Sequence, residues 1–336
     1  MKYRLAVILL TILLNSCVQA QDKDGLTVMF WNTENLFDTV DDPAKDDDEF
    51  TPGGERHWTE KRYLTKLDNT ARLIAAVGED YAPDIIGLCE VENETVMDDL
   101  TRRSPLKEIG YRYVMTDSPD SRGIDVALIY RRSSFQLLSS REAYVNLKPQ
   151  GGGKTRNVLH VSGRIASMDT LDILVCHWPS RNTGVKKSEP LRQAAAGVVQ
   201  EIVDSIYGVR ARPYIVIMGD LNEGPGDPAV RTTLNTAKLD GAEKLPDRRL
   251  VAVMSGVRLG SYRYQGEWDK YDQFIVTASL LNGHGPRLVN PHVCNFDFIQ
   301  EPDEKYGGKK PKRTYNGMTY QPGYSDHLPV ALDLEF

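Results

Sequence analysis

Short apolar runs alternate with polar segments along the chain, and most of these runs have the length of β-strands. Some of them, such as residues 215–218, are apolar at consecutive positions, which is typical of strands that are buried on both faces. Strands are predicted within residues 26–32, 83–93, 124–132, 157–165, 171–181, 212–222, 271–280 and 325–336.

Two longer segments have the helical repeat of apolar positions instead. The first helix is predicted to begin at Thr59 and the second to be capped by Ser188, both residue types that favour helix N-termini. Their apolar faces are predicted to contain Leu64, Leu67, Ala71 and Ile74 in the first helix, and Leu191, Ala194, Ala195, Val198, Ile202 and Ile206 in the second. Because no linker or internal repeat divides the chain, residues 26–336 are predicted to form one α/β domain with a layered core.

Several predicted core strands have a polar residue at one end. Asp220 and Asn222 follow an apolar strand directly, although removing a carboxylate from water is costly. Taken alone, Asp220 is compatible with a turn before Gly224, and His177 is compatible with a hydrogen-bonded core histidine. The repetition of this feature predicts one polar rim, formed by Asn32, Glu90, His177, Asp220, Asn222, Asp272, Asp326 and His327.

The segments around these residues resemble the endonuclease/exonuclease/phosphatase superfamily. "FWNTENLFD", "IIGLCEVEN", "VCHWPSR", "MGDLNEGP", "YDQFIV" and "YSDHLPV" occur in the order found in that family, and the resemblance covers residues 26–336. Each motif is short, but the ordered set is specific. The resemblance implies an α/β fold in which two packed, mainly antiparallel β-sheets are flanked by helices, a four-layer sandwich with its active site at one rim.

The resemblance also implies a metal site and a position for the attacking water. Glu90 matches the main ligand of a hard divalent cation, and Asn32 lies beside it. Asp326 matches a carboxylate that contributes to the metal site from the opposite side. Asp220 matches the residue that orients or deprotonates the water, and Asn222 matches one that holds the water and the phosphate. Oxygen ligands of this kind suit Mg²⁺ or Mn²⁺, with Ca²⁺ as a further alternative.

Two histidines complete the implied machinery. His327 matches a histidine that touches the scissile phosphate, and Asp272 matches the aspartate that orients its imidazole and favours its charged form. Both side chains are expected at the wet rim of the domain. His177 matches a second histidine that can protonate the leaving group. Arg156 resembles a phosphate-binding arginine. Asp125 is expected to orient His177 or, alternatively, to be a solvated loop residue.

The N-terminal residues have the pattern of an export signal. Lys2 and Arg4 precede the apolar run 5–14, which is too short to span a bilayer. Residues 1–20 are therefore predicted to be a signal peptide, cleaved after Ala20 or processed as a bacterial lipobox that ends at a lipid-bearing Cys17. Either route places the mature protein outside the cytoplasm, in the periplasm, at the cell surface or secreted.

Charge and cysteine content limit the remaining interpretations. Without Lys2 and Arg4 the chain has 39 basic and 47 acidic residues, a net charge of −8, which argues against a protein that coats nucleic acid. The acidic loop 38–55 is predicted to be solvated, with a calcium site as the alternative, and the basic loop 307–313 to be solvated or to contact a phosphate backbone. Cys89, Cys176 and Cys294 show no zinc or disulfide pattern.

These observations predict an exported, divalent-metal-dependent phosphodiesterase, acting as a monomer on the phosphodiester bonds of DNA or RNA. A phosphatase or phospholipase C that acts on inositol phosphates or sphingolipids is the alternative, because loops rather than the catalytic core select the substrate. A non-catalytic surface protein on the same fold would be expected to have lost Glu90, Asp220 or His327, and the chain retains all three.

Overall fold

Two large β-sheets form the centre of the molecule. The computed structural model describes residues 25–78 and 81–336. The first sheet has the order β14 (Arg287–Val293), β19 (Val330–Glu335), β1 (Gly25–Leu36), β2 (Ile85–Val91), β4 (Asp125–Tyr130) and β3 (Arg112–Met115). The second has the order β5 (Gln136–Ala143), β6 (Val158–Arg164), β7 (Thr170–His177), β8 (Tyr214–Asp220), β13 (Asp272–Thr277), β10 (Leu250–Ala252) and β9 (Ala237–Lys238).

Each sheet is mainly antiparallel but contains parallel strands. In the first sheet β1 and β2 are parallel, and in the second β7 and β8 are parallel, as are the short β9 and β10. The carboxyl ends of β1, β2, β7 and β8 meet at one edge of the sandwich, because the two sheets pack face to face with these central strands in contact. This edge is the rim that holds the polar residues.

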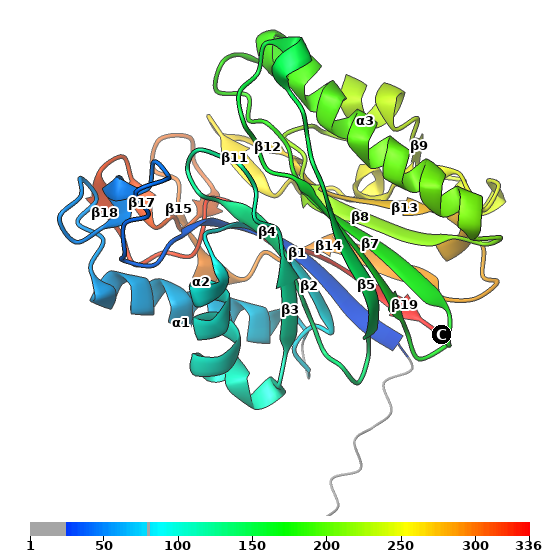
Figure 1. The fold of residues 1–336 in the computed structure, drawn as a ribbon, viewed down its shortest axis with the longest axis horizontal. Coiled ribbons are helices and arrows are strands. Elements are labelled where there is room, and N and C mark those ends of the chain that lie inside the picture. The colour runs from blue at the N-terminus through cyan, green and yellow to red at the C-terminus, as the bar shows by residue number, and fades with distance from the viewer. Residues whose placement is uncertain (1–24, 79–80) are drawn as a thin grey trace, which may run out of the picture.

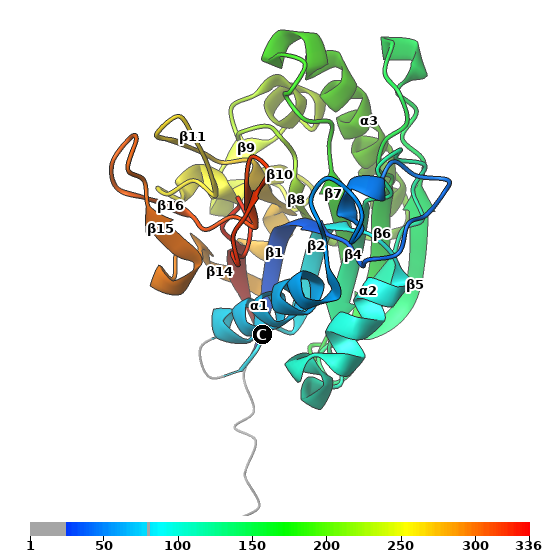
Figure 2. The same cartoon turned by 90° about the vertical axis from the view of Figure 1, so that its left-hand side faces the viewer.

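Helices cover the outer face of each sheet, which makes four layers (Figures 1 and 2). The helices α1 (Glu60–Val77) and α2 (Glu94–Asp98) lie on the first sheet, and α3 (Val185–Val209) lies on the second. The predicted α/β sandwich is therefore confirmed. Among the described residues, no helix has the length and apolarity that crossing a membrane requires.

Apolar side chains fill the space between the two sheets. Phe30 of β1, Met218 of β8 and Phe274 of β13 are fully buried there. A β-carbon at Gly87 of β2 would lie 2.5 Å from the Met218 Sδ, so the close approach of the two sheets requires glycine at this position. A second cluster lies between the second sheet and α3. The three described cysteines are buried and unpaired within these strands and loops.

The two long helices differ in detail from their predicted faces. Thr59 is the N-cap of α1, as predicted, but Leu64 is 47% exposed. The buried face of α1 is instead rotated toward Tyr63 and Lys66, whose polar ends have partners inside the protein. The helix α3 begins before Ser188, which lies in its first turn and donates a hydrogen bond to the Gly184 carbonyl.

Short hairpins extend the molecule beyond the sheets at the end that bears the polar rim (Figure 1). They pair β11 (Tyr262–Tyr264) with β12 (Glu267–Asp269), β15 (Gln300–Pro302) with β16 (Lys309–Pro311), and β17 (Tyr315–Asn316) with β18 (Thr319–Tyr320). Part of the basic loop 307–313 is thus strand β16, and Lys309 and Lys310 pair with acidic residues, Asp297 and Glu301. The predicted signal peptide and Cys17 lie outside the described residues.

Candidate active site

Cross-strand register aligns three of the predicted residues at the rim of the second sheet. His177 ends β7 and is the parallel partner of Asp220, which ends β8. Asp220 in turn faces Asp272, the first residue of β13, across an antiparallel pair. Two carboxylates and an imidazole thus stand side by side because three adjacent strands end or begin at the same level.

His327 approaches this group from the loop before β19. Its Nδ1 lies 2.7 Å from the Asp272 Oδ2, which also accepts a 2.5 Å hydrogen bond from the Ser261 hydroxyl. The His327 ring packs on Tyr262, with 4.7 Å between the ring centroids. Both His327 and Asp272 are buried, so their predicted exposure at the wet rim is wrong. The hairpin β11–β12 and the segment before it cover the pair.

The carboxylates decide the charge of His327. Burial alone would lower the pKa of this imidazole, but the negative charges of Asp272 and Asp220 outweigh burial and hold the pKa well above its usual value. His327 is therefore a cation at neutral pH. Its Nε2 lies 3.8 Å from the Asp220 Oδ2 and is the ring nitrogen left to contact a substrate.

Asp220 is arranged as a base. Its Oδ2 accepts a 3.1 Å hydrogen bond from the Asn32 side chain, and its Oδ1 accepts one of 3.0 Å from the Asn222 backbone. Burial raises the pKa of Asp220 to about 6, with the charge of Asp272 adding to the increase and that of His327 opposing it. A carboxylate with this pKa is ionised at neutral pH and accepts a proton more readily than an ordinary aspartate.

Glu90 faces the same space from the first sheet. Its Oε2 accepts a 3.0 Å hydrogen bond from the Asn35 backbone, and its Oε1 lies 3.4 Å from the Asn32 amide nitrogen. Its side chain is 14% exposed, more open than those of the two aspartates. Glu90 and Asn222 both have left-handed backbone conformations, with φ of 59° and 49°. Such strain is uncommon outside glycine and concentrates at functional sites.

Asp326 completes the rim next to His327. Its Oδ1 lies 4.0 Å from the His327 Nε2, and its Oδ2 pairs with Arg313 at 3.0 Å. Arg313 also pairs at 3.0 Å with Glu34, a buried carboxylate that accepts a further hydrogen bond from the Thr314 backbone. Asp326 is therefore close to the site but already shares its charge with an arginine.

His177 lies between Glu90 and Asp220. Its Nε2 is 3.8 Å from the Glu90 Oε1 and 3.7 Å from the Asp220 Oδ2. Burial lowers the pKa of His177 well below its usual value, and the positive charges of Arg156, Arg122 and His327 add to this effect. His177 is therefore neutral and must gain a proton before it can act as a general acid.

Asp125 and Arg156 lie near the rim with partners of their own. The Asp125 Oδ1 accepts hydrogen bonds from the Thr116 hydroxyl and the Ser118 backbone. In the part of the chain that the structure describes, the His177 Nδ1 has no hydrogen-bond partner, so Asp125 does not orient His177 in this conformation. Arg156 pairs with Asp120 at 3.0 Å. It also shares the Trp178 carbonyl with the Asn222 amide, which places Arg156 beside Asn222.

The donor set fits a hard divalent cation. Ligand atoms of Asp220, Asp272 and His327 lie within 4.8 Å of one another, and this is the metal-compatible group found among the described residues. The 2.7 Å contact between Asp272 and His327 already engages two of those atoms. The carboxylate of Glu90 is more open than those of Asp220 and Asp272, and the Asn32 amide nitrogen lies 3.4 Å from its Oε1.

Three features of the site were missed at the level of sequence. Glu34 lies within the quoted segment "FWNTENLFD", but its position two residues after Asn32 gives no sign of its pairing with Arg313. Arg313 belongs to the basic loop 307–313, which is predicted to be solvated or to contact a phosphate backbone, and its pairing with Glu34 and Asp326 was not predicted. Lys66 is fully buried beneath the rim and donates hydrogen bonds to the Thr314 hydroxyl at 2.7 Å and to the Tyr324 carbonyl.

The family and the fold of this chain follow from its similarity to known proteins. A model described as the Endonuclease/Exonuclease/phosphatase family matches residues 27–336. None of the curated proteins matches this sequence.

Among solved structures, a Bacteroides thetaiotaomicron endonuclease/exonuclease/phosphatase family protein is similar with a TM-score of 0.59 and 16% identity, covering 92% of this chain and 97% of its own. A mannosyl-6-phosphatase from the same organism has a TM-score of 0.58 and 17% identity, covering 93% and 100%. A humanized Danio rerio (D. rerio) TDP2 has a TM-score of 0.57 and 14% identity, also covering 93% and 100%. At these identities the similarity shows a shared fold.

Proposed function

Since this chain belongs to the endonuclease/exonuclease/phosphatase family and is a metal-dependent phosphoric ester hydrolase, we propose that it is an exported phosphodiesterase that hydrolyses DNA or RNA. The observation that carries the reaction type is the contact of His327 with Asp272 beside Asp220. This arrangement combines a fixed positive charge with a carboxylate of raised pKa, the two groups that water attack on a phosphodiester requires.

Each residue has one task in the proposed reaction. Asp220 accepts the proton of the attacking water, and Asn222 orients that water and the phosphate. His327 donates a hydrogen bond from Nε2 to a non-bridging phosphate oxygen, and Asp272 keeps its imidazole charged and oriented. When bound at Glu90, Asn32 and Asp326, the divalent cation, Mg²⁺ or Mn²⁺, supplies positive charge that offsets the negative charge of the phosphate and the leaving oxygen.

A phosphodiester is favoured because two histidines face the site, His177 from the end of β7 and His327 from the loop before β19. His177 lies 3.7 Å from the Asp220 Oδ2, so the proton that Asp220 takes from the attacking water can pass to His177. With His327 on the phosphate, the protonated His177 then donates this proton to the leaving oxygen, a task that matters most for the alkoxide released from nucleic acid. His177 resembles a histidine that is present in the deoxyribonuclease and sphingomyelinase branches of the family, which supports a phosphodiester substrate.

Phosphomonoester hydrolysis is the second candidate, and one cavity favours it. A pocket of about 290 Å³ adjoins Glu34 and is lined by Arg56, Arg313 and Tyr315. Its small size suits a compact leaving group such as a sugar. The structurally similar mannosyl-6-phosphatase acts on a sugar phosphate, as its name states. In this case the pocket would hold the sugar next to the metal site.

A substrate panel separates the two candidates. We expect the purified protein with Mg²⁺ or Mn²⁺ to cleave plasmid DNA, RNA and bis-p-nitrophenyl phosphate faster than p-nitrophenyl phosphate, mannose 6-phosphate, inositol phosphates or sphingomyelin. Faster release of phosphate from the monoesters would replace the nuclease assignment by that of a phosphatase. Activity that is unchanged in EDTA would contradict the metal-assisted reaction itself.

We also propose that the protein acts outside the cytoplasm as a monomer. The support is the basic and apolar pattern of residues 1–20, which is typical of export signals, and Cys17 would add a lipid anchor if the lipobox is used. An exported nuclease would meet environmental nucleic acid, a substrate class that suits a net negative protein using a metal ion and a few local cations.

A further inference from the structure

One arginine bridges two carboxylates at the edge of the candidate active site. The Arg313 Nε lies 3.0 Å from the Glu34 Oε1, and the Arg313 Nη2 lies 3.0 Å from the Asp326 Oδ2. Glu34 belongs to β1 of the first sheet, whereas Asp326 lies in the loop before β19. A single guanidinium thus holds together two acidic side chains that come from distant parts of the chain.

The local backbone of β1 presents Glu34 to this arginine. The pairing of β1 with β2 shifts its register between Asn32 and Leu36, which marks a bulge in the strand. Within it Glu34 has a left-handed φ of 53°, and its backbone nitrogen donates a 2.9 Å hydrogen bond to the Asn32 side chain. The second oxygen of the buried Glu34 side chain accepts a 2.8 Å hydrogen bond from the Thr314 backbone. Both oxygens of Glu34 are therefore engaged by donors of the protein.

Asp326 is shared between this arginine and the reacting groups. Its Oδ2 accepts the hydrogen bond from Arg313, and its Oδ1 lies 4.0 Å from the His327 Nε2. The Arg313 side chain is 47% exposed, so the bridge lies at the open edge of the site. Arg313 therefore fixes Asp326 through one oxygen and leaves the other oxygen facing the reacting groups.

Buried Lys66 fastens the two segments that carry the bridge. It donates hydrogen bonds to the Thr314 hydroxyl at 2.7 Å and to the Tyr324 carbonyl, close in sequence to the bridging arginine and to Asp326. Burial lowers the pKa of Lys66 to about 8, and the charges of Glu34 and Asp326 oppose this decrease. Lys66 is therefore charged at neutral pH and forms a second fixed cation behind the same carboxylates.

The balance of charges at this edge matches one divalent cation. Within the described residues, the five carboxylates that meet at the rim are Glu34, Glu90, Asp220, Asp272 and Asp326. The three cations of the protein that face them are His327, Arg313 and Lys66. In the free protein the excess is two negative charges, which one divalent cation offsets and a second one would reverse.

We propose that Arg313 takes the place of a second divalent cation, so that the rim binds a single ion next to Glu90. This inference rests on the proposed function, because it concerns the cation that assists the proposed hydrolysis. A guanidinium keeps its charge at neutral pH, and its planar fork suits carboxylate oxygens. A cation that approached Glu34 and the Asp326 Oδ2 would meet this fixed positive charge and would have to displace two charged hydrogen bonds. Arg313 is thus a positioning residue that also sets the number of bound ions.

Counting bound ions tests the inference without any turnover. The probe is Mn²⁺, titrated into the full chain at neutral pH, with the free ion measured by electron paramagnetic resonance. The test variant is Arg313→Met, which keeps the length of the side chain and removes its charge.

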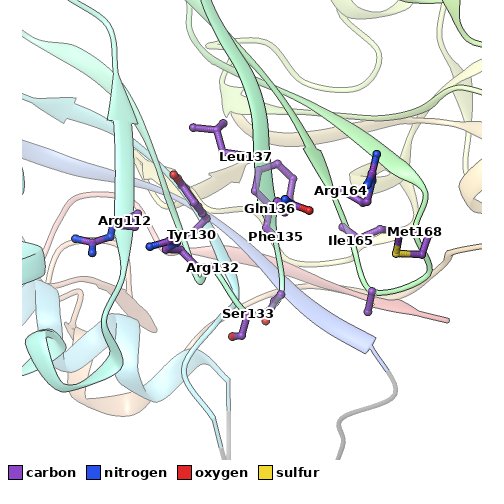
Figure 3. Close-up of a pocket in the computed structure, with 12 residues that line it drawn as sticks. Arg112, Tyr130, Arg132, Ser133, Phe135, Gln136, Leu137, Arg164, Ile165 and Met168 are labelled. Carbon is purple, nitrogen blue, oxygen red and sulfur yellow. The ribbon is translucent and has the colours of Figure 1, made fainter.

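Arg164→Met is the matched control, because Arg164 is an exposed arginine far from the rim. It lines a separate cavity of about 630 Å³ (Figure 3). Arg164 pairs with Thr170 at the start of β7, whereas His177 ends the same strand at the rim.

We expect Arg313→Met to bind one more Mn²⁺ per chain than the wild type, with lower affinity than the first ion. Glu34→Gln should abolish this extra ion in the Arg313→Met background and leave the wild-type number unchanged, because Glu34 is free to bind a cation only when the arginine is absent. Arg313→Lys, which keeps the positive charge, and Arg164→Met should both bind the wild-type number of ions.

Two results would overturn the inference and leave the proposed function intact. One is the same number of bound Mn²⁺ ions in folded Arg313→Met and in the wild type. The other is the loss of an ion from the wild type on Glu34→Gln alone, a comparison that does not require any arginine variant to fold. If Glu90→Gln leaves Mn²⁺ binding by the wild type unchanged, the proposed metal site is wrong, and this inference fails together with it.

Discussion

Asp220 and Asp272 stand directly opposite each other across β8 and β13, and the imidazole of His327 contacts both carboxylates. Two like charges in a cross-strand pair repel each other, so this register is unfavourable unless a cation lies between them. His327 supplies that cation from a loop that is more than 50 residues later in the chain than Asp272. The arrangement binds the three residues into one electrostatic unit.

The first prediction tests this unit by a double-mutant cycle. His327→Ala and Asp272→Ala should each lower kcat by a factor on the order of 10²–10³, because each change removes the same charged contact to the transition state. The double variant should be little slower than the slower single variant, since groups that act as a unit are strongly non-additive. Steady-state kinetics on bis-p-nitrophenyl phosphate measure all three variants.

Burial of the pair makes a stability control necessary. Asp272 is 1% exposed, so an alanine there also leaves a buried space. Asp272→Asn keeps the volume and should show nearly the same kinetic loss with a smaller change in the free energy of unfolding. Multiplicative losses in the cycle, or normal turnover by folded Asp272→Asn, would make Asp272 a structural residue only.

A second prediction concerns the assignment of the metal to Glu90. Glu90→Gln should weaken Mg²⁺ binding and lower activity at limiting Mg²⁺, with partial recovery at high Mg²⁺, because a carboxylate ligand is replaced by a neutral one. Glu201→Gln, at an exposed site on α3, is the matched control and should leave the Mg²⁺ dependence unchanged. Calorimetric titration of Mg²⁺ gives the readout without turnover. Equal Mg²⁺ affinity in wild type and Glu90→Gln would remove Glu90 from the metal site.

The role of His177 is tested by comparing two substrates whose leaving groups differ in their need for a proton. If His177 protonates the leaving oxygen, His177→Ala should slow cleavage of DNA on the order of 10²–10³-fold, within the usual range for general acids. Cleavage of bis-p-nitrophenyl phosphate should change much less, because p-nitrophenolate leaves without a proton. Equal losses on both substrates would instead indicate that His177 positions Glu90 and Asp220, between which it lies.

The next prediction concerns Glu92, a buried carboxyl that is not one of the reacting groups and whose titration should make the stability of the protein depend on pH. Burial raises the pKa of this carboxyl to about 8, with the charges of Asp38 and Asp47 adding to the increase and the hydrogen bond from the Asp38 backbone opposing it. A raised folded-state pKa stabilises the protein below the unfolded value of about 4.5, and this stabilisation is lost as the pH rises through about 8.

The free energy of unfolding in urea should therefore fall between pH 5 and pH 9 in EDTA. Glu92→Gln should remove at most about 5 kcal/mol of this fall, because one pKa unit corresponds to about 1.4 kcal/mol. The glutamine can still accept the hydrogen bond from the Asp38 backbone. Parallel pH profiles for wild type and variant would show that Glu92 titrates normally.

The last prediction separates the two routes of export. Cys17→Ala should release the protein from the membrane fraction if the chain is a lipoprotein, whereas a chain that is cut after Ala20 should fractionate like the wild type. Mass spectrometry of the mature N-terminus identifies the cleavage site in both cases. Recovery of the protein from the cytosol with residues 1–16 intact would contradict export by either route.

Local sequence was enough to predict the central strands and the polar residue at the end of each one. A strand buried on both faces must be apolar throughout, so Asp220 after 215–218 is conspicuous without any knowledge of its neighbours. The N-cap at Thr59 is equally local. The face of α1 was predicted less well, because Lys66 counts as polar in a helical pattern but is buried through partners that are about 250 residues away.

Only the tertiary structure decided how these strand ends meet and what each side chain contacts. The sheet order puts β8 between β7 and β13, which brings Asp220 next to both His177 and Asp272. The pairing of Glu34 with Arg313 likewise joins residues 279 apart. Such contacts depend on strand order, register and loop path, which a local pattern of apolar and polar residues does not contain. The same packing buried His327 and left Asp125 bound to Thr116 and Ser118, because hydrogen-bond partners are set by proximity in space.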